Sequence, residues 1–420
     1  MSLASRLRRG AVSYVGSVRG FNRNVRLLLI ATALGGLAQG IFGVDFNLYV
    51  LSLGIQPDTL GGILSAGPIA HALASIPVGF LGELFGFRKA FAAIYGLGGI
   101  AYLTQVATSN VNIIAVGAFL AGLAFSGDFV VRLPFIAANT DPEQRALVFS
   151  YSSVLSAISA AIGALIAGYM PNWIGAFVAD LPTAYRYTLY ISGLGALAAV
   201  LPALLMRDHA PKEPKKISLH PYLWGIDRFT VRVASVELFI GVTMGMIIPF
   251  MNVFYLYRLG TSREFFGNVA ALAVLPVMTA TVIGPAIAKR MTNIGAVRAA
   301  RWLIPVSTLL MAATTNAYLG TAGYWAYRAL FMMSQSIWFA FVMDTAAPRG
   351  KVAASAWLEI TFWIGMAIAA PATGYLLARQ SYTLPFLISA AAAVVTGFLT
   401  DRCARVCQAP SETSEEAQGA

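Results

Sequence analysis

The sequence predicts an all-α integral membrane protein with twelve transmembrane helices in two six-helix bundles. Hydrophobic residues make up 58% of the chain and charged residues only 11%, whereas a soluble domain has roughly 25% charged residues. Apolar segments long enough to cross a bilayer, which takes about 20 residues, recur along all 420 residues. The second half of the chain also repeats the glycine pattern of the first half. These features indicate a polytopic protein built by duplication.

Composition divides the chain into five parts. A basic cytoplasmic arm is predicted at 1–24, and a polar cytoplasmic loop at 207–228 separates the halves. The N-terminal bundle is expected over 25–206 and the C-terminal bundle over 229–402, followed by a disordered polar tail at 403–420. The individual spans are predicted near residues 25–52, 59–84, 88–107, 111–138, 146–170, 185–206, 229–257, 264–288, 299–317, 322–344, 352–378 and 382–401.

The lysines and arginines predict which side faces the cytoplasm. Of the 29 bases, 23 lie on one side of the predicted spans, four lie on the other side and two fall within spans. Because cytoplasmic segments carry the excess of bases, we predict a multi-pass protein of the cell (inner) membrane with both termini in the cytoplasm. The bases that give the net charge of +11 are therefore interpreted as setting the orientation of the chain in the membrane, and no nucleic-acid partner is expected.

Glycines mark an internal repeat. Gly36 and Gly40 in the first predicted span reappear 205 residues later as Gly241 and Gly245 in the seventh. Small residues at these positions allow helices to approach closely in a membrane. The common offset predicts that the first and seventh spans occupy equivalent places in two related bundles.

The connection between the second and third spans reads GFLGELFGFRK, residues 79–89. Its glycines permit a tight turn, with an acid before the turn and bases after it. The stretch resembles the loop 2–3 signature of the major facilitator superfamily. The matching residues are Gly79, Leu81, Gly82, Glu83, Gly86 and Arg88, while Leu84 and Phe87 replace two usual arginines.

This resemblance implies the major facilitator superfamily (MFS) fold, with two parallel-repeat bundles and a substrate site between them. It also implies a gating role for the signature loop, including Glu83, Arg88 and Lys89. Asp128 and Arg132 are four residues apart in the fourth span, so they share a helix face. They are expected to join this gating network rather than to contact substrate.

Three acids within the predicted spans are candidates for the transport cavity, because a charge at the bilayer centre costs about 2.5–3.5 kcal/mol. Asp45 lies in the outer half of the first span, either as a proton or cation site or as a cap at the outer surface. Glu237 and Glu359 lie in the inner halves of the seventh and eleventh spans. They either face the cavity or pair with bases at the inner surface.

The neutral polar residues of the spans are few. Those expected at the cavity are Gln39, Asn47, Asn252 and Gln335, with Trp338 as an apolar candidate. This scarcity favours an amphipathic substrate over a sugar. His71 is the only histidine within a span, and it is interpreted as a packing residue.

The sequence therefore predicts a secondary transporter of a small molecule, proton-coupled and favouring efflux of an amphipathic compound. An uptake symporter or a facilitator for a polar solute is the alternative, and a membrane enzyme or a non-transporting sensor or scaffold is the alternative of another class. No catalytic residues, cofactor or metal site are expected, because the sequence has no phosphate-binding loop of the G-x-x-x-x-G-K-[ST] kind and no metal-ligand cluster. The expected partners are the substrate, protons and the lipid bilayer, and the chain is expected to be a monomer.

Overall fold

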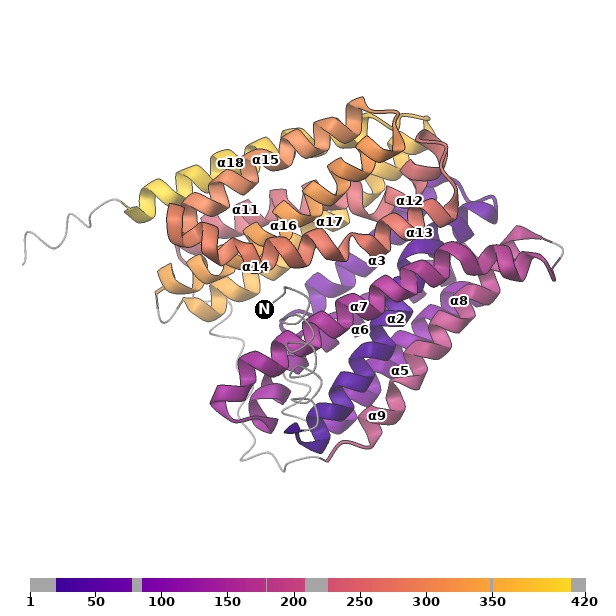
Figure 1. Ribbon diagram of the computed structural model, residues 1–420, viewed down its shortest axis with the longest axis horizontal. Coiled ribbons are helices and arrows are strands. Elements are labelled where there is room, and N and C mark those ends of the chain that lie inside the picture. Colours follow the sequence, from indigo (N-terminus) through magenta and orange to yellow (C-terminus); the bar gives the residue numbers. More distant parts are fainter. Residues whose placement is uncertain (1–19, 78–84, 179, 208–225, 348–349, 409–420) are drawn as a thin grey trace, which may run out of the picture. The chain divides into compact units, whose positions relative to one another are not determined.

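The computed structural model describes residues 20–77, 85–178, 180–207, 226–347 and 350–408 (Figure 1). Every regular element in these residues is a helix. The helices are α2 (Arg23–Ser52), α3 (Pro57–Ala74), α5 (Phe87–Ala107), α6 (Val111–Asn139), α7 (Pro142–Gly175), α8 (Leu181–Ala198), α9 (Val200–Leu204), α11 (Arg228–Ile247), η2 (Ile248–Phe250), α12 (Met251–Val253), η3 (Phe254–Arg258), α13 (Arg263–Leu272), α14 (Val274–Met291), α15 (Asn293–Ala313), α16 (Ala317–Thr345), α17 (Lys351–Ala378) and α18 (Leu384–Gln408).

Twelve long helical segments of the described chain account for the predicted spans. Helix α8 continues into α9, α11 continues through η2 and α12 into η3, and α13 continues into α14. Ten of the twelve segments are long and apolar enough to cross a membrane. The other two, α3 and α16, occupy the places of the second and tenth predicted spans. The predicted all-helical membrane fold is confirmed.

Several helix ends differ from the prediction by four or more residues. Helix α18 continues to Gln408, so the start of the predicted disordered tail at 403–420 is helical instead. Helix α3 ends at Ala74, whereas the predicted span extends to residue 84, of which residues 78–84 lie outside the described part. The residue before a proline is biased away from helical geometry, and Pro77 follows the end of α3. Helix α15 begins at Asn293, six residues before the predicted start at 299. Thr292 caps it, since the hydroxyl oxygen of Thr292 accepts a hydrogen bond from the backbone N–H of Gly295.

The chain forms two compact units. Unit 1 comprises residues 1–49 and 74–216, and unit 2 comprises residues 50–73 and 217–420. Helix α3 therefore groups with unit 2, although the predicted N-terminal bundle extended over 25–206. The reason is a close crossing of α3 with α17, where a Cβ atom on Gly61 would lie 2.6 Å from the carbonyl oxygen of Ala370.

In unit 1, glycines let α2 cross α7 at backbone contact. A Cβ atom on Gly40 would overlap the backbone of Ala160 in α7. A Cβ atom on Gly36 would lie 2.8 Å from the carbonyl oxygen of Ser156, also in α7. From the opposite side, a Cβ atom on Gly163 would overlap the carbonyl oxygen of Leu37. The first and fifth spans of the unit are thus packed against each other without intervening side chains.

In unit 2, α11 and α17 cross in the same way. A Cβ atom on Gly241 would overlap the carbonyl oxygen of Phe362, and one on Gly245 would lie 2.8 Å from the Cα atom of Met366. A Cβ atom on Gly365 would lie 2.8 Å from the backbone nitrogen of Val242. The repeated glycines therefore serve the same crossing in both halves, which confirms the equivalence that their offset predicts.

Helix caps show the repeat a second time. Asn110 precedes α6 and its side chain accepts hydrogen bonds from the backbone N–H groups of the following turn. Asn316 precedes α16 and caps it in the same way. At the start of α8, Asp180 caps through the backbone N–H of Thr183, and hydrogen bonds from Thr183 lower the pKa of the Asp180 carboxyl.

Candidate functional site

Unit 1 contains a cavity of about 400 Å³. It is bounded by α2, α5, α6 and α7 with one contribution from α8. Aromatic side chains form much of its wall, and polar groups enter from α2, α6 and α7. Its principal lining residues are Thr32, Gln39, Tyr95, Tyr102, Phe125, Asp128, Phe129, Arg132, Phe149, Ser153 and Ser156. This size and this mixture of apolar walls with few polar groups are typical of small-molecule sites.

An ion pair lies in the wall of this cavity. Asp128 and Arg132 of α6 form a salt bridge one helical turn apart. The Tyr95 hydroxyl donates to Oδ1 of Asp128 at 2.9 Å, and Nη1 of Arg132 donates to the Ser152 hydroxyl at 3.2 Å. The carboxylate and the guanidinium thus neutralise each other beside the cavity. Both residues line the same cavity as Gln39, and their expected gating role stays a prediction.

Unit 2 holds a second polar cluster, formed around Glu237 of α11. Its carboxylate is almost fully buried, at 1% exposure. The side-chain amide of Gln335 in α16 donates to both carboxylate oxygens, at 3.1 Å and 3.0 Å. Arg301 of α15 interacts with Glu237 electrostatically. Two of the predicted cavity residues, Glu237 and Gln335, are therefore direct partners.

Arg301 is the functional candidate that the sequence analysis missed. The predicted span at 299–317 places Arg301 near its cytoplasmic end, but Arg301 lies inside α15 and is 1% exposed. Its Nη1 donates to the Thr400 hydroxyl of α18 at 2.6 Å, and its guanidinium carbon lies 4.3 Å from the ring centroid of Trp338. Trp338 is itself fully buried. The expectation that Trp338 lines an open cavity does not agree with this packing inside unit 2.

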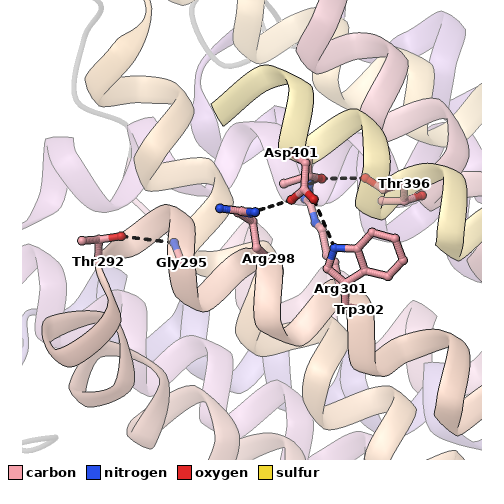
Figure 2. Close-up of polar contacts among 8 residues, drawn as sticks. Thr292, Gly295, Arg298, Arg301, Trp302, Thr396 and Asp401 are labelled. Carbon is pink, nitrogen blue, oxygen red and sulfur yellow. Dashed lines mark hydrogen bonds and ion pairs between the residues drawn. The ribbon is translucent and has the colours of Figure 1, made fainter. Parts of the chain in front are cut away.

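The surroundings of Arg301 differ sharply from those of Arg298, which lies one turn earlier in α15. Arg298 and Trp302 both reach Asp401 of α18, at 2.5 Å and 3.4 Å (Figure 2). The Arg298 side chain is 46% exposed, so this pair lies at the surface. Helices α15 and α18 run side by side here (Figure 1). One helix therefore presents a surface arginine and a buried arginine to the same partner helix.

The two polar clusters occupy corresponding places in the repeat. Glu237 lies 205 residues after Thr32, which lines the unit 1 cavity. The unit 1 cluster draws on the first, third and fourth spans, and the unit 2 cluster draws on the seventh, ninth and tenth. Each unit thus holds a polar cluster at a corresponding place, built from different residues.

Glu359 has one partner in its own helix and one in another helix. Its Oε2 accepts a hydrogen bond from the Trp363 indole at 3.0 Å, and it lies 3.9 Å from Nε2 of His71 in α3. The imidazole of His71 also stacks on Trp363, with ring centroids 4.0 Å apart. Among the described residues, Glu359 forms no salt bridge with a lysine or an arginine. The packing interpretation of His71 agrees with this stacked, buried position.

Comparison with known proteins gives the family. The family model described as Major Facilitator Superfamily matches residues 28–232, which include most of α2, the residues that line the unit 1 cavity and the start of α11. The chain belongs to the Major Facilitator Superfamily. The chain is therefore a multi-pass integral membrane protein of a transporter family and not an enzyme.

Individual relatives of this superfamily member are distant. YncC of Bacillus subtilis (strain 168), whose name places it among metabolite transport proteins, is 27% identical over 186 residues. That match covers 42% of this chain and 38% of YncC. The crystal structure of the nucleoside transporter NupG superposes with a TM-score of 0.75 at 13% identity, covering 90% of this chain and 98% of NupG. An inward-facing, unoccupied structure of a bacterial homolog to human lysosomal transporter Spinster superposes with a TM-score of 0.72 at 13% identity. This match covers 92% of this chain and 98% of the homolog.

The superfamily signature loop is described in part. Gly79 and Glu83 lie outside the described residues. Gly86 precedes α5 with φ of 80°, a conformation that glycine adopts without strain. Arg88 and Lys89 follow in the first turn of α5 and are exposed. The gating role of this loop stays a prediction.

The outer-half candidates of this MFS protein are buried. Asp45 is fully buried in α2, and Asn47 follows it at 4% exposure. In unit 2, Asn252 lies in the irregular stretch between η2 and η3, and its side-chain oxygen accepts from the backbone N–H of Val253 at 2.9 Å. This side-chain bond helps to satisfy backbone that the interrupted helix leaves without its regular partner.

Proposed function

We propose that the chain is a secondary transporter that moves a small amphipathic molecule across the membrane by alternating access. The unit 1 cavity carries this proposal. Its aromatic side chains offer apolar contact area, while the Asp128–Arg132 pair offers both signs of charge at one place. A ligand with an apolar body and a neutral or zwitterionic polar group fits that lining. The names of the relatives, which concern metabolite and nucleoside transport, support transport without specifying the substrate.

We further propose coupling to protons, with export as the favoured direction. Asp45 and Glu237 are carboxyl groups buried within spanning helices, and such groups are rare in membranes unless they have a function. A carboxyl group that faces opposite sides in turn can bind a proton on one side and release it on the other. Asp45 is the first candidate for this role and Glu237 the second.

Accumulation in liposomes tests the coupling. The membrane potential contributes about 2.3 kcal/mol per charge at 100 mV, which supports roughly fiftyfold accumulation if one proton accompanies one neutral substrate. Purified protein in proteoliposomes, screened against amphipathic and polar compounds, should accumulate substrate only when a proton gradient is imposed. Asp45→Asn and Glu237→Gln should reduce accumulation to equilibration, whereas Asp58→Asn, at an exposed position in α3, should transport normally.

Each outcome of this screen has a distinct meaning. Equilibration without accumulation by the unmodified protein would identify a facilitator and end the coupling proposal. Accumulation by both neutral variants would exclude these two carboxyl groups as the coupling site. The direction of the gradient that drives accumulation distinguishes export from uptake. If no compound moves, the non-transporting sensor or scaffold becomes the better interpretation.

Filling the unit 1 cavity should block transport without unfolding the protein. Ala157 of α7 lines the cavity, so Ala157→Phe should lower the transport rate of the identified substrate by about tenfold or more, as expected when roughly 1.4 kcal/mol of binding is lost. Ile162, on the same helix, is 47% exposed and is not among the lining residues. Ile162→Phe is therefore the matched control, and equal transport by both variants would contradict a ligand site here.

A further inference from the structure

An apolar groove crosses the surface of unit 2. It lies between α14, α15 and α16, with a volume of about 500 Å³. Its walls include Ile283 and Ile287 of α14, Leu303 of α15 and Leu330 of α16. Its lining includes a hydroxyl side chain, that of Thr279, which donates to its own helix at the carbonyl oxygen of Leu275. The groove therefore presents an almost purely hydrocarbon surface.

Small residues create this groove. Ala296, Ala299 and Ala300 of α15 and Ala280 of α14 contribute to its lining. A bulkier side chain at these positions would occupy the space between the helices. The side chains that flank the groove remain open, since Ile283 is 47% exposed and Leu303 is 51% exposed.

The dimensions match one leaflet of a bilayer. The groove follows α14 from Pro276 to Ile287, which is about 16 Å at 1.5 Å per residue. Half of the hydrocarbon core is about 15 Å thick. A single acyl chain lying parallel to α14 would thus follow the groove along most of its length.

Two bases lie just beyond one end of the groove. Lys289 and Arg290 lie in the last turn of α14, two and three residues after Ile287, and both are exposed. At about 1.5 Å per residue they lie a few ångströms past the apolar lining, at the level where a headgroup begins. Basic groups beside an intramembrane groove are suited to an anionic headgroup.

We propose that this groove binds an anionic phospholipid, with one acyl chain along α14 and the headgroup phosphate at Lys289 and Arg290. The proposal concerns a lipid site in unit 2 and does not depend on transport by unit 1. By the charge distribution of the sequence, the lipid would come from the cytoplasmic leaflet.

Native mass spectrometry of the full-length protein tests the two parts of the site separately. Detergent-solubilised protein is titrated with phosphatidylglycerol or phosphatidylcholine of identical acyl chains. The unmodified protein should bind the first phosphatidylglycerol more tightly than phosphatidylcholine, by about fivefold for each base that contacts the headgroup. Lys289→Gln combined with Arg290→Gln should remove this preference, whereas Lys351→Gln, an exposed base on α17, should keep it.

The groove itself is tested by filling it. Ala299→Phe should weaken binding of both lipids, while Val306→Phe, on the same helix at a 61% exposed position that is not among the lining residues, should weaken neither. Equal lipid binding by Ala299→Phe and Val306→Phe would overturn the proposal. If an added amphipathic transport substrate displaces the bound lipid from the groove, phospholipid is not the occupant and this assignment is overturned.

Discussion

Gly40→Ala and Gly241→Ala should each destabilise the protein by about 1–3 kcal/mol, the usual cost of forcing a methyl group into a packed site. In both cases the new Cβ atom would overlap backbone atoms, those of Ala160 in α7 and Phe362 in α17. Backbone cannot rotate away as a flexible side chain can, so the helices must separate. The free energy of unfolding, measured by titrating detergent-solubilised protein with sodium dodecyl sulfate, should show the loss.

Gly43 provides the matched control, because it lies on α2 one turn from Gly40 and a Cβ atom there would meet nothing within 4 Å. Gly43→Ala should leave stability unchanged or raise it by up to about 1 kcal/mol through helix propensity. If Gly43→Ala and Gly40→Ala lowered the free energy of unfolding equally, alanine would destabilise α2 directly and the contact with α7 would not be the cause. A loss for Gly40→Ala without one for Gly241→Ala would contradict backbone contact as the shared cause at the two helix crossings.

The spanning helices were predictable because the bilayer imposes their length. Twelve apolar runs follow from a solvent in which backbone polar groups must be satisfied within each helix. The crossings were predictable for a related reason, since a glycine repeated at a fixed offset marks the positions where helices touch. The Asp128–Arg132 and Glu359–Trp363 contacts were also accessible, because residues four apart share a helix face.

Contacts between distant segments were beyond the sequence. The side-chain amide of Gln335 donates to Glu237, although the two residues are 98 apart in the sequence. No spacing rule relates such residues. The predicted span at 299–317 puts Arg301 near a helix end. Helix α15 instead begins at Asn293, because the Thr292 hydroxyl accepts a hydrogen bond from the backbone N–H of Gly295 and caps the helix. A hydroxyl residue at a helix start was the available signal. A helix that begins after Thr292 places Arg301 more than two turns inside the span.

The second prediction concerns this buried arginine. Arg301→Gln should destabilise the protein by about 3–5 kcal/mol, because removing one partner of a buried charged pair leaves the other without compensation. Arg301 is 1% exposed, interacts electrostatically with the equally buried Glu237, and packs on Trp338. Arg298→Gln, one turn earlier on the same helix, removes a pair whose arginine is 46% exposed. Surface pairs contribute only about 0–1 kcal/mol, so this control variant should remain nearly as stable as the original protein.

A double-mutant cycle separates charge from packing. If Arg301 acts by compensating Glu237, the combination of Arg301→Gln with Glu237→Gln should be more stable than the sum of the two single losses predicts, by about 1 kcal/mol or more. If Arg301 acts only through its stacking on Trp338 and its bond to Thr400, the two losses should simply add. The measurement is again the free energy of unfolding in mixed micelles. Equal effects of Arg301→Gln and Arg298→Gln would contradict a buried charge pair at the centre of unit 2.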